Sequence, residues 1–122
     1  MVLSVSKKMS GERSVITDAI RVIEEFRKMD QEMQMQTAMI FLLIAREEGL
    51  HSRDLMQHTG LTSASVSRNV AALSKYHRKG RPGHDVIVAR EDPIDRRNKQ
   101  LFLTGKGRAV INSIIERFKN GN

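Results

Sequence analysis

Four hydroxyl side chains and one arginine lie in one short run, Thr-Ser-Ala-Ser-Val-Ser-Arg-Asn at positions 62–69. Small residues permit close approach to a nucleic acid, hydroxyl groups can bond phosphates and base edges, and arginine can pair with guanine O6 and N7 in a major groove. The run therefore predicts a DNA contact. The candidate contact residues are Thr62, Ser63, Ser65, Ser67, Arg68 and Asn69. The alternative is an ordinary solvated helix face, since serine and asparagine occur on many protein surfaces.

A second cluster holds three cations close together, Arg96, Arg97 and Lys99, beside Asp95. Like charges in one turn repel each other and stabilise a fold little, so they favour an anionic partner. An arginine that enters a narrow minor groove meets an enhanced negative potential. Asp95 could hold one guanidinium through a charge-assisted hydrogen bond. The alternative is an exposed loop that is basic without a partner.

A helix-turn-helix over residues 52–74 would position the first cluster. Ser52 is the expected N-cap of a helix that ends near His58, and Gly60 suits a turn that needs a positive φ. The second helix, 62–74, has its apolar face at helical spacing. That face consists of Val66, Val70 and Leu73.

A β-hairpin, or wing, over residues 85–103 would position the second cluster. Residues 86–91 alternate as in a strand, Asp92-Pro93 ends that strand, and residues 100–103 return. We expect Leu50-His51 to add a short third strand. The predicted fold is mainly α with a small β-hairpin (α+β), a winged helix-turn-helix that contacts double-stranded DNA through recognition helix 62–74 and wing 86–103.

The remaining segments are expected to complete one domain, residues 11–122, behind a flexible arm at 1–10. A helix at 36–48 is apolar nearly all round, which is typical of a buried helix. Helices at 11–29 and 104–119, the second capped by Thr104, carry broad apolar stripes. These terminal helices favour a homodimer that buries both stripes, although each could cover its own domain. Four methionines are assigned to the core rather than to a ligand surface: Met29, Met33, Met35 and Met39.

Three motifs together resemble the MarR family of winged helix-turn-helix transcription regulators. They are the helix segment 61–68, the wing segment Glu-Asp-Pro-Ile-Asp-Arg-Arg at 91–97 and the exit segment Leu-Phe-Leu-Thr-Gly-Lys-Gly at 101–107. The resemblance implies a homodimeric repressor on a two-fold symmetric operator. It also implies that Ser63, Ser65, Ser67 and Arg68 face the major groove, and that Arg96 and Arg97 face the minor groove. The segment 74–85 is longer than is usual in the family.

Composition narrows the function further. The chain of 122 residues has 21 Lys and Arg against 14 Asp and Glu, a formal net charge of +7, which favours a polyanionic partner. It has no cysteine, so disulfides and thiolate metal sites are excluded. His51, His58, His77 and His84 lack metal-ligand spacing and are expected at the surface. We expect no enzyme, no cofactor, no metal and no membrane segment, and a cytoplasmic protein.

One alternative stays open beside the regulator. A winged-helix module could hold DNA with little sequence specificity as a replication or packaging accessory, because the basic segment 75–85 could follow the DNA backbone without reading bases. It could also be an adaptor that binds another protein. The sequence identifies no small-molecule effector.

Overall fold

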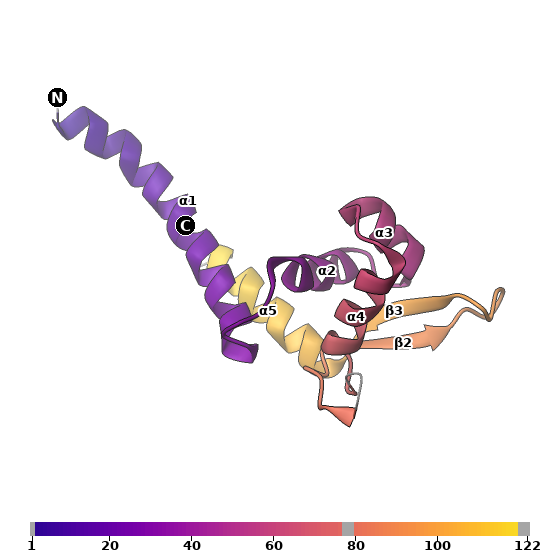
Figure 1. The fold of residues 1–122 in the computed structure, drawn as a ribbon. Helices are drawn as coiled ribbons and strands as arrows, with labels where there is room; N and C mark the ends of the chain where they lie inside the picture. The colour runs from indigo at the N-terminus through magenta and orange to yellow at the C-terminus, as the bar shows by residue number, and fades with distance from the viewer. Residues whose placement is uncertain (1, 77–79, 120–122) are drawn as a thin grey trace.

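The computed structural model describes residues 2–76 and 80–119. The elements follow one another as α1 (Val2–Met29), α2 (Met35–Arg46), β1 (Leu50–His51), α3 (Ser52–Thr59), α4 (Ser63–Leu73), β2 (Ile87–Glu91), β3 (Lys99–Leu103) and α5 (Gly105–Lys119). Figure 1 shows two parts: α2, α3, α4 and the sheet form one compact body, and α1 with α5 extends from it. The mainly helical α+β fold with a wing is confirmed.

The sheet has three antiparallel strands in the order β1-β3-β2. Leu101 of β3 pairs with Leu50 on one side and with Ala89 on the other. The predicted short strand at Leu50-His51 therefore exists, and it ties the start of α3 to the wing. The predicted cap of α5 is also confirmed, because the Thr104 hydroxyl accepts a hydrogen bond from the Gly107 N–H at 3.0 Å.

The core lies where the C-terminal part of α1 meets α2, α3, α4, the sheet and α5. Within it the rings of Phe26 and Phe41 pack edge to face with their centroids 5.9 Å apart. Burial of these apolar side chains is the main favourable term in the stability of such a domain. The core consists of Phe26, Ile40, Phe41, Ile44, Leu50, Leu55, Val66, Leu73, Val86, Ile87, Leu101, Ile111 and Ile114.

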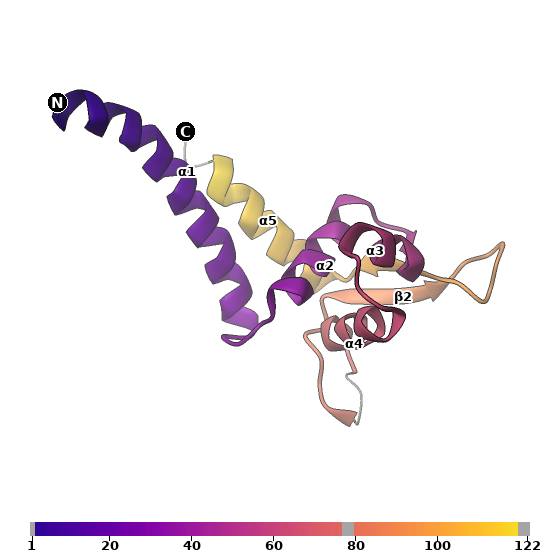
Figure 2. The ribbon, with the colours of Figure 1, turned by 45° about the horizontal axis from the view of Figure 1, so that its top comes forward.

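Helix α1 and helix α5 lie side by side, as both ribbon views show (Figures 1 and 2). The Arg117 guanidinium of α5 donates to the Glu25 carboxylate of α1, with Nη2 at 2.8 Å and Nε at 3.2 Å. This hydrogen bond is the main reason that the pKa of the largely buried Glu25 is lowered, and Lys28 adds to it. The two terminal helices therefore form a joined pair within one chain.

Two expectations about the helices are wrong. The first helix, expected to begin at residue 11, begins at Val2, so residues 2–10 of the expected arm are helical and α1 continues through Gly11. A glycine inside a helix costs only about 1 kcal/mol relative to alanine, which is too little to end a helix that nothing else interrupts.

Helix α2 is not buried on all sides. Thr37, Ile40, Phe41 and Ile44 are buried, but one apolar stripe faces outward: Met35, Met39 and Leu42, exposed by 82%, 47% and 37%. The assignment of all four methionines to the core is therefore wrong for Met35 and Met39, whereas Met29 and Met33 do pack against it. In a domain of this size the core covers only one side of α2, so the apolar side chains on its other side stay exposed.

Candidate DNA-binding surface

The turn between α3 and α4 is fixed by local hydrogen bonds. Gly60 has φ +74°, as the sequence predicted, and its N–H donates to the Met56 carbonyl at 2.8 Å. The Thr62 hydroxyl then accepts from the Ser65 N–H at 3.1 Å and caps α4. These contacts set the angle at which α4 leaves α3.

The N-cap of α3 is His51 and not Ser52. The backbone N–H of His51 donates to the Asp54 carboxylate at 2.8 Å, so a side chain of the first turn reaches back to the residue before the helix. Ser52 is instead the first helical residue, because β1 ends only at His51 and the helix begins directly after it.

The inner face of α4 contains two polar residues that were predicted to face DNA. Ser65 and Asn69 are 8% and 6% exposed. The Asn69 Oδ1 accepts from the Thr37 hydroxyl at 2.5 Å, and its Nδ2 donates to the Ser65 carbonyl at 2.8 Å. The predicted exposure of both residues is therefore wrong. The Asn69 amide holds α4 against Thr37 of α2, and both its oxygen and its nitrogen are satisfied there, as buried polar groups require.

The outer face of α4 presents the other candidates to solvent. Thr62, Ser63, Ser67 and Arg68 are all exposed. Ala64 is exposed between them, and sequence reasoning missed it because alanine carries no polar group. A helix face of small side chains with one arginine can approach a groove closely and place a bidentate donor at a base edge.

The tip of the wing is a turn built on two aspartates. The Asp92 carboxylate accepts from the backbone N–H of Ile94 at 2.8 Å, and the Asp95 carboxylate accepts from the N–H of Arg97 at 3.2 Å. Asp95 also accepts from the Asn98 amide at 2.9 Å. Aspartates that bond their own turn in this way fix a loop without a larger core.

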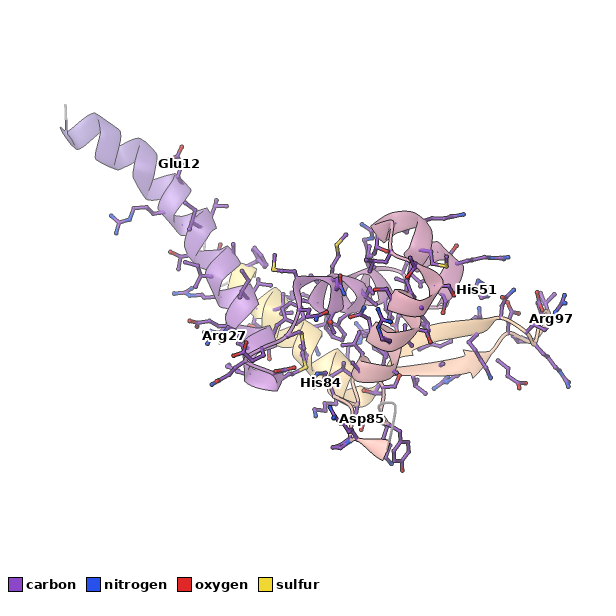
Figure 3. All side chains as sticks on the ribbon, viewed as in Figure 1. Glu12, Arg27, His51, His84, Asp85 and Arg97 are labelled. Atoms are coloured by element: carbon purple, nitrogen blue, oxygen red, sulfur yellow. The ribbon has the colours of Figure 1, made fainter. Side chains whose placement is uncertain are left out.

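The cations of the wing stay accessible on this turn. Arg97, whose side chain is 94% exposed, lies with its Nε 3.7 Å from the Asp95 carboxylate, close enough for an ion pair but too far for the predicted hydrogen bond. Arg96 is exposed, and Lys99 lies 3.9 Å from the Glu91 carboxylate across the strands. Figure 3 shows Arg97 at the far end of the hairpin. Exposed ion pairs of this kind contribute little stability, so these cations remain available for a partner.

The wing is connected to the helix-turn-helix by a side-chain contact that the sequence did not predict. His51 was expected at the surface, but its ring is 19% exposed and its Nε2 lies 2.8 Å from the Asp92 carboxylate. Asp92 lies 41 positions further along the chain. The backbone N–H of Ile94 and this histidine together lower the pKa of Asp92 from 3.8. The contact joins the start of α3 to the base of the wing turn.

The other histidines differ from one another. His58 is exposed, as expected. His84 is half-buried with its Nε2 3.9 Å from the Asp30 carboxylate, and His77 lies outside the described residues. Within residues 2–76 and 80–119, no group of three His, Asp or Glu side chains could hold a metal ion.

We expect Asp92→Asn to lower the midpoint of thermal unfolding at pH 7, because the amide cannot pair with His51 as a carboxylate does. The folded-state pKa of Asp92 is lowered, so its contribution is present above about pH 4 and is lost as the pH falls through the folded value. The difference between the variant and the wild type should therefore shrink in acid. Circular dichroism melts from pH 7 to pH 2.5 measure it, and a difference that stays constant across this range contradicts the assigned role.

Comparison with solved structures, rather than with known sequences, identifies the fold. No protein-family model matches the chain, and no curated protein matches its sequence. Solved structures do match. The crystal structure of MarR is 21% identical, with a TM-score of 0.61 over 93% of this chain and 77% of that one. The transcriptional regulator Tm0710 from Thermotoga maritima is 26% identical, with a TM-score of 0.63 over 92% of this chain and 75% of that one. The chain has the MarR-family fold.

The MarR fold has also been solved with DNA. The crystal structure of the S. aureus MepR-DNA complex is 18% identical to this chain, with a TM-score of 0.65 over 96% of this chain and 84% of that one. The resemblance inferred from the helix, wing and exit motifs is thus confirmed for the fold. No helix among the described residues of this MarR-like chain is long and apolar enough to cross a membrane.

Proposed function

We propose that the protein is a homodimeric transcription regulator, a repressor, that binds double-stranded DNA in a sequence-specific manner. The main support for the proposal is that this MarR fold presents two accessible surfaces at the same time. One is the outer face of α4 with Arg68, and the other is the wing turn with Arg96 and Arg97. The structure of MepR with DNA supports the proposal for this fold.

We propose that α4 enters the major groove with its outer face. Thr62, Ser63 and Ser67 would bond phosphates and base edges, and Ala64 would allow close approach. Arg68 would read a guanine. Ser65 and Asn69 would act behind this face, because both are buried and the Asn69 amide already bonds Thr37 and the Ser65 carbonyl.

We propose that the wing enters the neighbouring minor groove. Arg96 and Arg97 project from a turn whose backbone is held by Asp92 and Asp95, so little freedom is lost on binding. Lys99 would meet the phosphates beside the groove. The His51–Asp92 pair would keep the wing at a constant angle to α3.

The dimer is proposed from apolar surface that one chain leaves uncovered. Six large apolar side chains of the terminal helices are 43% to 68% exposed: Val15, Ile16, Ile20, Ile23, Ile115 and Phe118. Each square ångström of such surface removed from water contributes roughly 25 cal/mol. Contiguous apolar faces of this kind mark interaction sites, and two copies of the α1–α5 pair would cover each other with two-fold symmetry.

Binding to a random duplex library, followed by sequencing of the bound fraction, tests the proposal. We expect an enriched two-fold motif whose half-sites lie about one helical turn apart. Strong salt-dependent binding without enrichment would instead support a DNA-holding module. The selected motif placed in the promoter of a reporter gene then tests repression, which requires reporter output to fall when the protein is expressed.

Two arginine variants should separate base reading from backbone contact. Arg68→Ala should relax specificity at one base position and cost about 1–3 kcal/mol on the selected operator. Arg97→Ala should weaken binding to all sequences and reduce the slope of log K against log salt by about one unit. Arg21→Ala on α1, which removes the same charge from an exposed position, is the control. Fluorescence anisotropy at several salt concentrations measures both, and unchanged affinity in both variants would refute the groove assignment.

A further inference from the structure

The segment between α4 and β2 projects from the domain as a second basic hairpin. Tyr76 and Pro82 form an isolated antiparallel bridge, so the chain turns back on itself here. Figures 1 and 2 both show this segment leaving the end of α4 away from the wing tip. We propose that its described arms, residues 74–76 and 80–84, form a second contact with the DNA backbone. This inference rests on the proposed function.

The base of the hairpin is held firmly to α4. The N–H groups of Gly83, His84 and Val86 donate at 2.9 Å to the carbonyls of Lys75, Ala72 and Leu73 in turn. A Cβ on Gly83 would lie 1.8 Å from the Ser74 carbonyl oxygen, so the two arms touch backbone to backbone. A projection that is already ordered at its base loses little conformational entropy when it binds.

Lys75 and Arg81, the two cations of the described arms, form no ion pair with any carboxylate among the described residues. Lys28, Arg108 and Arg117, by contrast, each pair with a glutamate. Lys75 lies over the ring of Tyr76 at 5.6 Å, and that ring is 72% exposed. Unpaired exposed charge contributes little to folding, but it suits a polyanion.

The position of the hairpin favours DNA over another polyanion. Arg68 of the outer face of α4, Ala72 and His84 line one hollow, so the base of the hairpin adjoins the helix face assigned to the major groove. The wing extends from the sheet in a different direction (Figure 1). DNA bound to α4 would thus have phosphates near Lys75 and Arg81 that the wing does not reach. Lysine and arginine at such phosphates add affinity but no sequence preference.

The test compares Lys75→Ala/Arg81→Ala with the wild type and with Arg13→Ala/Arg21→Ala. The control double variant removes the same charge from exposed positions of α1, which extends away from α4 (Figure 2). Each protein is titrated by fluorescence anisotropy with the operator selected from the library and with a scrambled duplex, at several salt concentrations. Hydroxyl-radical footprints on the operator are recorded for the same proteins and for Arg97→Ala.

The hairpin variant should lose about 0.9 units of salt slope for each phosphate contact removed, up to about 2 units in total. Its preference for the operator over the scrambled duplex should be unchanged. Its footprint should lose protection at phosphates that Arg97→Ala still protects. A salt slope and footprint like those of the wild type or the α1 control would overturn the inference while leaving the proposed function intact. Failure of the wild type to bind DNA would overturn the proposed function itself.

Discussion

Replacing Gly107 with alanine is expected to destabilise the fold by about 2–3 kcal/mol, the cost of adding a methyl group to a site with no room for it. A Cβ at this position would lie 2.0 Å from the Val86 carbonyl oxygen and 3.0 Å from its carbonyl carbon. Both are backbone atoms at the start of the wing. That carbonyl is also held by the Thr104 N–H at 3.1 Å, so it cannot move away cheaply.

Gly105 provides a matched control two residues earlier in the same helix. A Cβ there would meet nothing within 4 Å, so alanine should be neutral or should stabilise the helix by up to about 1 kcal/mol. Urea unfolding followed by circular dichroism measures both variants, and the midpoint should fall only for Gly107→Ala. Equal stability of the two variants would contradict the close packing of α5 on the strand. The difference between the two positions also explains physically why residue 107 is a glycine.

Replacing Ile20 with glutamate is expected to separate the proposed dimer and to lower operator affinity by about 10²–10⁴-fold. Ile20 is 51% exposed, at the middle of the apolar face of α1. A carboxylate buried there without a partner would have to give up its hydration, which is unfavourable by several kcal/mol. Once the two chains part, each half-site is bound separately, and the gain from binding both at once is lost.

Light scattering measures the separation of the dimer, and fluorescence anisotropy measures the loss of operator affinity on the same sample. The molecular mass in solution should fall to that of one chain, and circular dichroism should show the same helix content, because the site is exposed in the single chain. Ser14→Glu, which adds the same charge at an exposed position about 120° round the helix from Ile20, should leave mass and affinity unchanged. A wild-type protein that is already monomeric, or a dimeric Ile20→Glu variant, contradicts the assignment of this face.

The local features of the fold were predictable from the sequence. Gly60 marked the turn between α3 and α4, Thr104 marked the cap of α5, and the alternation in residues 86–91 marked β2. The physical reason is that a cap, a positive φ or a strand period depends on residues within a few positions of each other. In the wing the hairpin itself was predicted, but Asp95 holds the Arg97 backbone N–H and the Asn98 amide rather than the expected guanidinium.

Contacts between distant residues were decided only by the tertiary structure. Asn69 looked like a DNA contact because it is polar, but its partner Thr37 lies 32 positions away and draws it into the interior. His51 looked like a surface residue until Asp92 was brought to it across the sheet. The exposed stripe of α2 was not predicted for the same reason. An apolar run in the sequence does not show which of its sides a small domain can cover. Residue types thus indicated which groups could meet DNA, and packing decided which of them remain free to do so.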